Sequence, residues 1–170
     1  MNPTDPVASC HRYFDAWRAR DAAAVLATLA PGGRYEDPLT GDPIAGDALR
    51  GYMQGLWAAF PDLDFELGEV HRVGDATVHG SWTMTGHNSG SFHGLPPTGR
   101  AVRAPGIDVI RVGADGIEDV RGYFDSAAVP RQLGLDVIVQ PREIGPFAFG
   151  ISTVVRRPQP VTPGVLAFTE

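Results

Sequence analysis

The chain has almost no cysteine, since Cys10 is the only one in 170 residues. No disulfide can therefore form within the chain, and a metal site built from several thiolates is excluded. Cys10 lies at helical spacing from Val7, Phe14 and Trp17. This spacing predicts a small, buried apolar side chain, which is a common fate of a free cysteine.

Long apolar runs and basic runs are also missing. No window approaches the ~20 consecutive apolar residues of a membrane helix, and the first residues have neither a basic n-region nor an apolar h-region. The formal net charge is -6, and the only Lys/Arg run is Arg156-Arg157. Nucleic acid, which proteins bind through basic residues on its phosphate backbone, is therefore a poor candidate for a partner. We expect a cytoplasmic protein that binds neither nucleic acid nor a membrane.

Several catalytic signatures are absent as well. The sequence has no glycine-rich phosphate loop, no G-x-S-x-G elbow and no Cys/His pair, so nucleotide chemistry and covalent hydrolysis are not predicted. The five histidines do not fall at the paired spacings of metal ligands on a helix. They are His11, His71, His79, His87 and His93. We expect neither a metal nor a cofactor.

What remains is the composition of one folded domain followed by a tail. Hydrophobic residues make up 43% of the chain and charged residues 20%, which is ordinary for a globular protein. The length suits one domain and not two complete ones. We predict a domain over residues 1–136 and an extension over 137–170, which is rich in proline and alternates in places. We expect one of three roles for the extension: extra strands or an arm that packs on the domain or on a second subunit, the first strands of a truncated second domain, or a disordered tail.

Apolar periodicity predicts helices at the start of the domain and strands after them. Helices are expected over about 5–19 and 47–60, with a short helix between them that Asp21 caps. Pro31-Gly32-Gly33 is expected to end that short helix before the next strand. From Leu63 onward the period changes to two, in four segments separated by turn residues, which favours an antiparallel meander. A short helix at about 127–133 would close this α+β domain.

One carboxylate, Asp37, stands at the end of a short strand immediately before a proline. Pro38 lacks an N–H and keeps Asp37 out of the helical region, which fixes the side chain at the strand end. This position suits a general base. The structural alternative is that Asp37 caps a turn through an Asx-type bond.

Three segments, in order, resemble the catalytic set of ketosteroid isomerases: RYFD with Tyr13, EDP with Asp37, and IDVIR with Asp108. Those enzymes combine an Asp base with an oxyanion hole made of a Tyr and a protonated Asp. The resemblance implies that Asp37 is the base and that Tyr13 and Asp108 are the donors. Otherwise, Tyr13 packs on its helix face and Asp108 pairs with an arginine.

Longer segments resemble the SnoaL-like polyketide cyclases over roughly residues 12–135; they are FPDLDFEL, TMTGHNSGSFHGLPPTGR and GYFDSAAVPRQLGL. Both families belong to the nuclear-transport-factor-like superfamily. The resemblance implies a cone-shaped barrel, in which a strongly curved antiparallel sheet wraps around three N-terminal helices. It also implies that Asp125, near the end of the last strand, is an acid/base residue.

A hairpin loop at residues 113–116 would place Val112 opposite Ile117 and Asp108 opposite Arg121. Asp125 would then share a face with Asp108 and Arg121, and a one-residue change of register would break this cluster. The arrangement resembles limonene-type epoxide hydrolases, which hold a water between two Asp and an Arg. Here the arginine comes from a neighbouring strand instead of their Arg-x-Asp pattern.

The large aromatic side chains are expected in the core and as pocket walls that raise the pKa of a carboxyl group. The predicted substrate-binding residues are Trp17, Trp57, Trp82, His87, Arg121 and Phe124. We predict an acid–base enzyme, an isomerase or aldol cyclase that works through an enolate of a small hydrophobic carbonyl substrate. We also expect a homodimer. The alternative is a non-catalytic ligand-binding or dimerisation module of the same fold.

Overall fold

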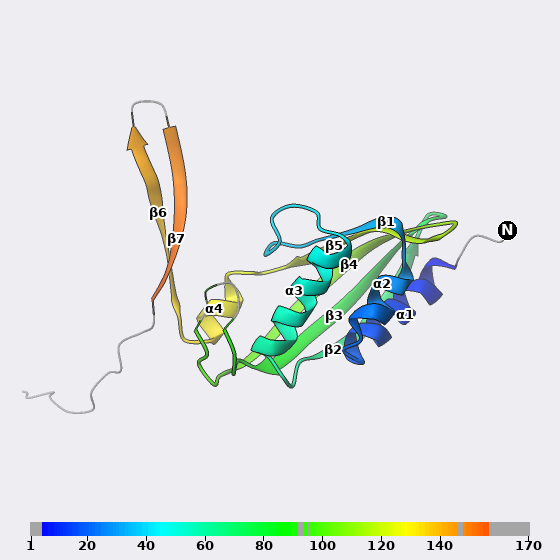
Figure 1. Ribbon diagram of the computed structural model, residues 1–170, viewed down its shortest axis with the longest axis horizontal. Helices are drawn as coiled ribbons and strands as arrows, with labels where there is room; N and C mark the ends of the chain where they lie inside the picture. Colours follow the sequence, from blue (N-terminus) through cyan, green and yellow to red (C-terminus); the bar gives the residue numbers. More distant parts are fainter. Residues whose placement is uncertain (1–4, 92–93, 95, 146–147, 157–170) are drawn as a thin grey trace, which may run out of the picture.

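The computed structural model describes residues 5–91, 94, 96–145 and 148–156 (Figure 1). Its elements, in chain order, are α1 (Pro6–Arg18), α2 (Ala22–Thr28), β1 (Leu29–Glu36), α3 (Gly46–Ala59), β2 (Asp64–Val73), β3 (Thr77–His87), β4 (Ala101–Gly113), β5 (Gly116–Phe124), α4 (Ala128–Gln132), β6 (Asp136–Gly145) and β7 (Ala148–Arg156). The predicted α+β class is confirmed. No helix in these ranges is long and apolar enough to cross a membrane.

The first two helices begin at acidic caps, and the cap of the second is the Asp21 that the sequence predicted. The Asp5 carboxylate accepts from the Val7 N–H, and the Asp21 carboxylate accepts from the N–H groups of Ala23 and Ala24 at 2.9 Å. These bonds satisfy amides that have no partner inside the helix. Both helices then bury their apolar faces against the sheet and against each other.

Strands β2 to β5 form the predicted antiparallel meander, and β1 adds to its edge in parallel with β5, giving the order β1-β5-β4-β3-β2. The sheet is strongly curved, and α1, α2 and α3 lie against its concave face (Figure 1). The expected cone is therefore present. Its sheet is open, with β1 and β2 as the two edges.

The start of β1 differs from the prediction. Helix α2 already ends at Thr28, and the Pro31-Gly32-Gly33 segment lies inside β1 instead of before it. The pairing of β1 with β5 is irregular between Leu29 and Arg34, and Gly32 has a φ of +77°. The segment is therefore a bulge that bends the edge strand, and not a helix terminator.

Along each strand, side chains point alternately into the core and away from it. In β3 the inward positions are Val78, Gly80, Trp82 and Met84, whereas their neighbours are partly exposed. Cys10 is fully buried next to Gly80, where an added Cβ would come within 2.9 Å of its sulfur. Burial raises the pKa of the Cys10 thiol to about 12, so the predicted role as a small apolar side chain is confirmed.

The C-terminal extension begins with a hairpin. β6 and β7 pair antiparallel as a separate two-stranded sheet, which projects away from α4 (Figure 1). The role of the extension stays a prediction, and residues 157–170 lie outside the described residues. The division of the chain at residue 136 stays a prediction.

Candidate active site

A cavity lies inside the cone, between α1, α3, the end of β1, the concave face of the sheet and α4. The volume of the cavity that the centres of water molecules can reach is about 70 Å³. This is small beside the ~300–1,000 Å³ of drug-sized pockets, so it suits a compact ligand. The predicted site residues that line it are Tyr13, Trp17, Asp37, Trp82, Asp108 and Phe124.

The walls are largely aromatic. Six rings follow one another with neighbouring ring centres no more than 6.2 Å apart: Tyr52, Tyr35, Trp17, Phe65, Trp82 and Phe124. These rings give the cavity apolar walls, which lower the local dielectric. Any charge inside therefore interacts more strongly with its neighbours than it would in water.

Asp37 follows directly after β1 and is only 5% exposed. Its Oδ1 accepts from the backbone N–H groups of Leu39 (2.7 Å) and Thr40 (2.9 Å), which is the Asx-type turn considered above. Its Oδ2 accepts from the hydroxyls of Tyr35 (2.7 Å) and Tyr52 (2.5 Å). Four donors thus fix the carboxylate at the edge of the cavity, so the turn and the predicted site occur together.

Asp108 points inward from β4 and is 4% exposed. Its Oδ1 accepts from the indole N–H of Trp82 at 2.7 Å. Trp82 reaches it across Gly106, where an added Cβ would come within 2.3 Å of the indole ring. Burial raises the pKa of Asp108 from 3.8 to about 7, the charge of Asp37 adds to the rise, and the Trp82 bond opposes it.

The two carboxyl groups flank Gly122 of β5. A Cβ on Gly122 would lie 3.2 Å from Asp108 Oδ1 and 3.3 Å from Asp37 Cβ, so glycine at this position lets both groups face the same space. Tyr13 of α1, 1% exposed, lines the cavity with them. Burial, and next the charge of Asp108, raise the pKa of Tyr13 well above 10, which keeps its hydroxyl protonated.

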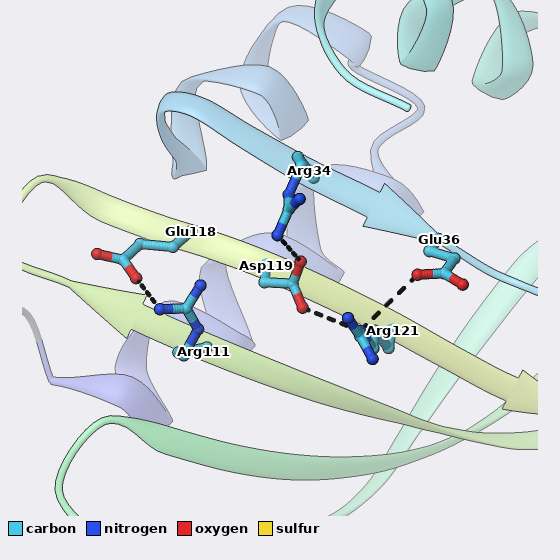
Figure 2. A network of polar contacts seen from close by, with 6 residues as sticks. All are labelled: Arg34, Glu36, Arg111, Glu118, Asp119 and Arg121. Carbon is cyan, nitrogen blue, oxygen red and sulfur yellow. Dashed lines mark hydrogen bonds and ion pairs between the residues drawn. The ribbon is translucent and has the colours of Figure 1, made fainter. Parts of the chain in front are cut away.

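The predicted pairing of Asp108 with Arg121 is wrong. Val112 does lie opposite Ile117, but a bulge at Glu118 shifts the register, and Asp108 lies opposite Gly122. Arg121 therefore points to the opposite, exposed face of the sheet. Figure 2 shows it there in a network of ion pairs from three strands, whose members are Arg34, Glu36, Arg111, Glu118, Asp119 and Arg121.

Three other predicted residues lie away from the cavity lining. Asp125 is exposed, accepts from the N–H groups that start α4, and pairs with Arg131 at 3.0 Å. His87 is exposed and contacts Asp62 at 2.6 Å. Trp57 is half-buried and packs edge-to-face on Trp17. The predicted cluster of Asp108, Arg121 and Asp125 is therefore not formed.

Tyr35 and Tyr52 were missed by the sequence reasoning. The signal for Tyr35 was available, because residues two apart on a strand share a face and Tyr35 lies two before Asp37. Tyr52 lies on the apolar side of α3, where nothing in the sequence pointed to Asp37. Within the described part of the chain, no three His, Cys, Asp or Glu side chains gather as metal ligands.

Comparison with known proteins identifies a related family. A family model described as SnoaL-like domain matches residues 10–126. Among solved structures, a protein from Jannaschia sp. CCS1, provisionally named a SnoaL-like polyketide cyclase, has a TM-score of 0.68 and 24% identity, covering 77% of this chain and 92% of that one. IdmH from Streptomyces antibioticus, also provisionally named a polyketide cyclase, has a TM-score of 0.67 and 24% identity, covering 77% and 99%.

A third structure is a hypothetical protein with a ketosteroid isomerase-like fold from Catenulispora acidiphila, solved in complex with trimethylamine. Its TM-score is 0.65 and its identity 20%, covering 75% of this chain and 93% of that one. At these identities the likeness shows the fold. No curated protein sequence matches the chain.

Proposed function

Because the chain belongs to the SnoaL-like domain family, we propose that it is a cofactor-independent acid–base enzyme acting on a compact, hydrophobic carbonyl compound. The reaction begins with removal of a proton from the carbon next to the carbonyl. The resulting enolate is then either reprotonated at another carbon, which is an isomerisation, or attacks a second carbonyl, which is an aldol cyclisation.

One observation carries the proposal: two buried carboxyl groups with different surroundings face one apolar cavity. Asp37 accepts four hydrogen bonds, which fix its carboxyl group at the edge of the cavity. Asp108 accepts a hydrogen bond from the Trp82 indole N–H on Oδ1, and burial raises its pKa to about 7, so it carries a proton for much of the time at neutral pH. An ionised carboxylate beside a protonated one is the arrangement that divides base and donor roles.

In the proposed step, Asp37 Oδ2 takes the proton and the carbonyl oxygen becomes an oxyanion. The Tyr13 hydroxyl and the protonated Oδ2 of Asp108 donate to that oxygen. Among the described residues no group donates to Asp108 Oδ2, so this oxygen is available to a ligand. Donors placed in advance in a dry site stabilise the developing charge more than water does.

Two alternatives have less support. An epoxide hydrolase would need an arginine between the carboxylates, whereas no arginine is among the described residues that line the cavity.

A non-catalytic module would be favoured by a cavity that side chains fill. The open space between Tyr13, Asp37 and Asp108 favours the enzyme. The names of the relatives from Jannaschia and Streptomyces antibioticus support cyclisation as one outcome of the shared first step.

The first prediction uses β-tetralone, a compact two-ring ketone with exchangeable protons next to its carbonyl. The protein should accelerate the exchange of these protons for deuterium, followed by proton NMR. Asp37→Asn keeps an oxygen for the turn amides of Leu39 and Thr40 but is not a base, so the exchange rate should fall about 10²–10⁴-fold. The melting temperature should change little.

Asp64→Asn is the matched control, because Asp64 is an exposed carboxylate that pairs with Arg18 on the surface. It should leave the exchange rate at the wild-type value. Full activity in Asp37→Asn would remove Asp37 as the base. A parallel loss of rate and of folded protein would make its role structural.

A further inference from the structure

Among the described residues, Trp82 is the side chain that donates a hydrogen bond to Asp108. Its indole N–H lies 2.7 Å from Oδ1, and the two residues are 7% and 4% exposed. A hydrogen bond that is closed off from water is electrostatically stronger than the same bond at the surface. The indole is therefore able to fix the orientation of this carboxyl group.

The strand register explains how the indole reaches Asp108. Trp82 of β3 lies directly opposite Gly106 of β4, and Asp108 follows two residues later on the same face of the sheet. The ring crosses the position at Gly106, where an added Cβ would come within 2.3 Å of it. The rings of Phe65 and Phe124 pack against it, with centres 5.4 and 5.8 Å away. Its place therefore depends on the missing side chain at residue 106.

The chemistry of the two groups decides which oxygen carries the proton. A neutral carboxyl group has one oxygen that holds the proton and donates, and one carbonyl oxygen that only accepts. An indole N–H is a donor only, so it pairs best with the carbonyl oxygen. Oδ1 of Asp108 is then the acceptor, and the proton lies on Oδ2, to which no described residue donates.

We propose that Trp82 is a positioning residue for the oxyanion donor: its indole N–H occupies Oδ1 of Asp108, so that the acidic proton lies on Oδ2, the oxygen left for the substrate. This inference rests on the proposed function. Without the indole, the proton would be shared between the two oxygens, and the donor would no longer be fixed before the substrate binds. Donors that are fixed in advance are the ones that stabilise an oxyanion best.

The same bond limits the pH range in which Asp108 keeps its proton. Burial raises the pKa of Asp108 to about 7, the Trp82 bond lowers it, and the carboxyl group of Asp37 raises it. The other titratable groups that interact with Asp108 have raised pKa values and are neutral at pH 7; they are Cys10 and Tyr13 of α1, Tyr35 of β1 and Tyr52 of α3. Loss of the indole N–H should therefore raise the pH at which Asp108 gives up its proton.

Titration of Asp108 by carbon-13 NMR tests the bond without any substrate. In the wild type the carboxyl carbon should titrate with a midpoint of about 7. Trp82→Phe keeps an aromatic ring but has no N–H, so the midpoint should move upward by about one pH unit. Trp57→Phe is the matched control, because within the described part of the chain the Trp57 indole N–H has no hydrogen-bond partner. It should leave the midpoint of Asp108 unchanged.

A second replacement removes the N–H and keeps the shape of the ring. In 3-benzothienylalanine a sulfur atom stands in place of the indole N–H, so this analogue at position 82 should fold like the wild type and give the same upward shift. A midpoint that stays at the wild-type value in this protein would overturn the inference.

The β-tetralone exchange gives a second readout. In both proteins that lack the N–H, the fall in rate with rising pH should move upward together with the Asp108 midpoint. A rate that is lower by the same factor at every pH, with the fall in its wild-type place, would make Trp82 a packing residue only. Absence of exchange in the wild type would overturn the proposed function instead, while the titration would still decide whether Trp82 holds Asp108.

Discussion

At the scale of residues, two aspartates differ because of what surrounds them. Asp37 accepts from four donors, whereas Asp108 accepts from one indole N–H, so one residue type has two different surroundings in the same cavity. The sequence could place Tyr13, Asp37 and Asp108 in one cavity, because their motifs lie on elements with clear periodicity. It could not predict that Tyr52 contacts Asp37, since that contact depends on how α3 lies against β1.

The raised pKa of Asp108 predicts how stability changes with pH. Its folded value of about 7 lies above the ordinary 3.8, so folding favours the protonated form. The contribution is fully present below about pH 4, is lost as the pH rises, and is gone above about pH 7. A shift of this size corresponds to roughly 4 kcal/mol.

Asp108→Asn removes the titrating group and keeps the acceptor for Trp82. The wild type should lose stability relative to this variant between about pH 4 and pH 7, measured by urea unfolding at several pH values. Parallel curves for the two proteins would show that Asp108 titrates at its ordinary pKa, and it would then not be a protonated donor.

At the scale of elements, the hairpin of β4 and β5 was predicted in part: its turn was predicted, and its bulge was not. Its turn and the pairing of Val112 with Ile117 could be derived from turn residues and alternation. The bulge at Glu118 could not, because a charged residue with ordinary neighbours gives no sign that it will be left unpaired. That one residue moves Arg121 to the outer face, where Asp119 and Glu36 pair with it.

Asp125 belongs to this scale because it organises the start of α4. Asp125→Asn should cost less than about 1 kcal/mol of stability, because its amide oxygen still accepts from the N–H groups of Ala127 and Ala128 and only the exposed ion pair with Arg131 is lost. The rate of β-tetralone exchange should stay within a few-fold of the wild type. A loss of rate as large as that expected for Asp37→Asn would support the cyclase-like role that the resemblance implied for Asp125.

At the scale of the whole molecule, the cone follows from a curved meander that buries one face against α1 and α3. This much could be predicted, because antiparallel neighbours are close in sequence. The parallel pairing of β1 with β5 joins strands about 85 residues apart, as in Arg34 with Asp119, and no local pattern indicates it. It is nevertheless the pairing that brings Asp37 next to Gly122. The expected homodimer and cytoplasmic location stay predictions.

The central claim is that Asp37 is the base and that a protonated Asp108 is a donor, and the pH dependence of kcat/KM for β-tetralone exchange tests it most directly. If Asp108 must carry its proton, the rate falls as the pH rises through about 7, and Asp108→Asn loses this fall. A wild-type rate that instead rises through the same range would make Asp108 the base and contradict the account.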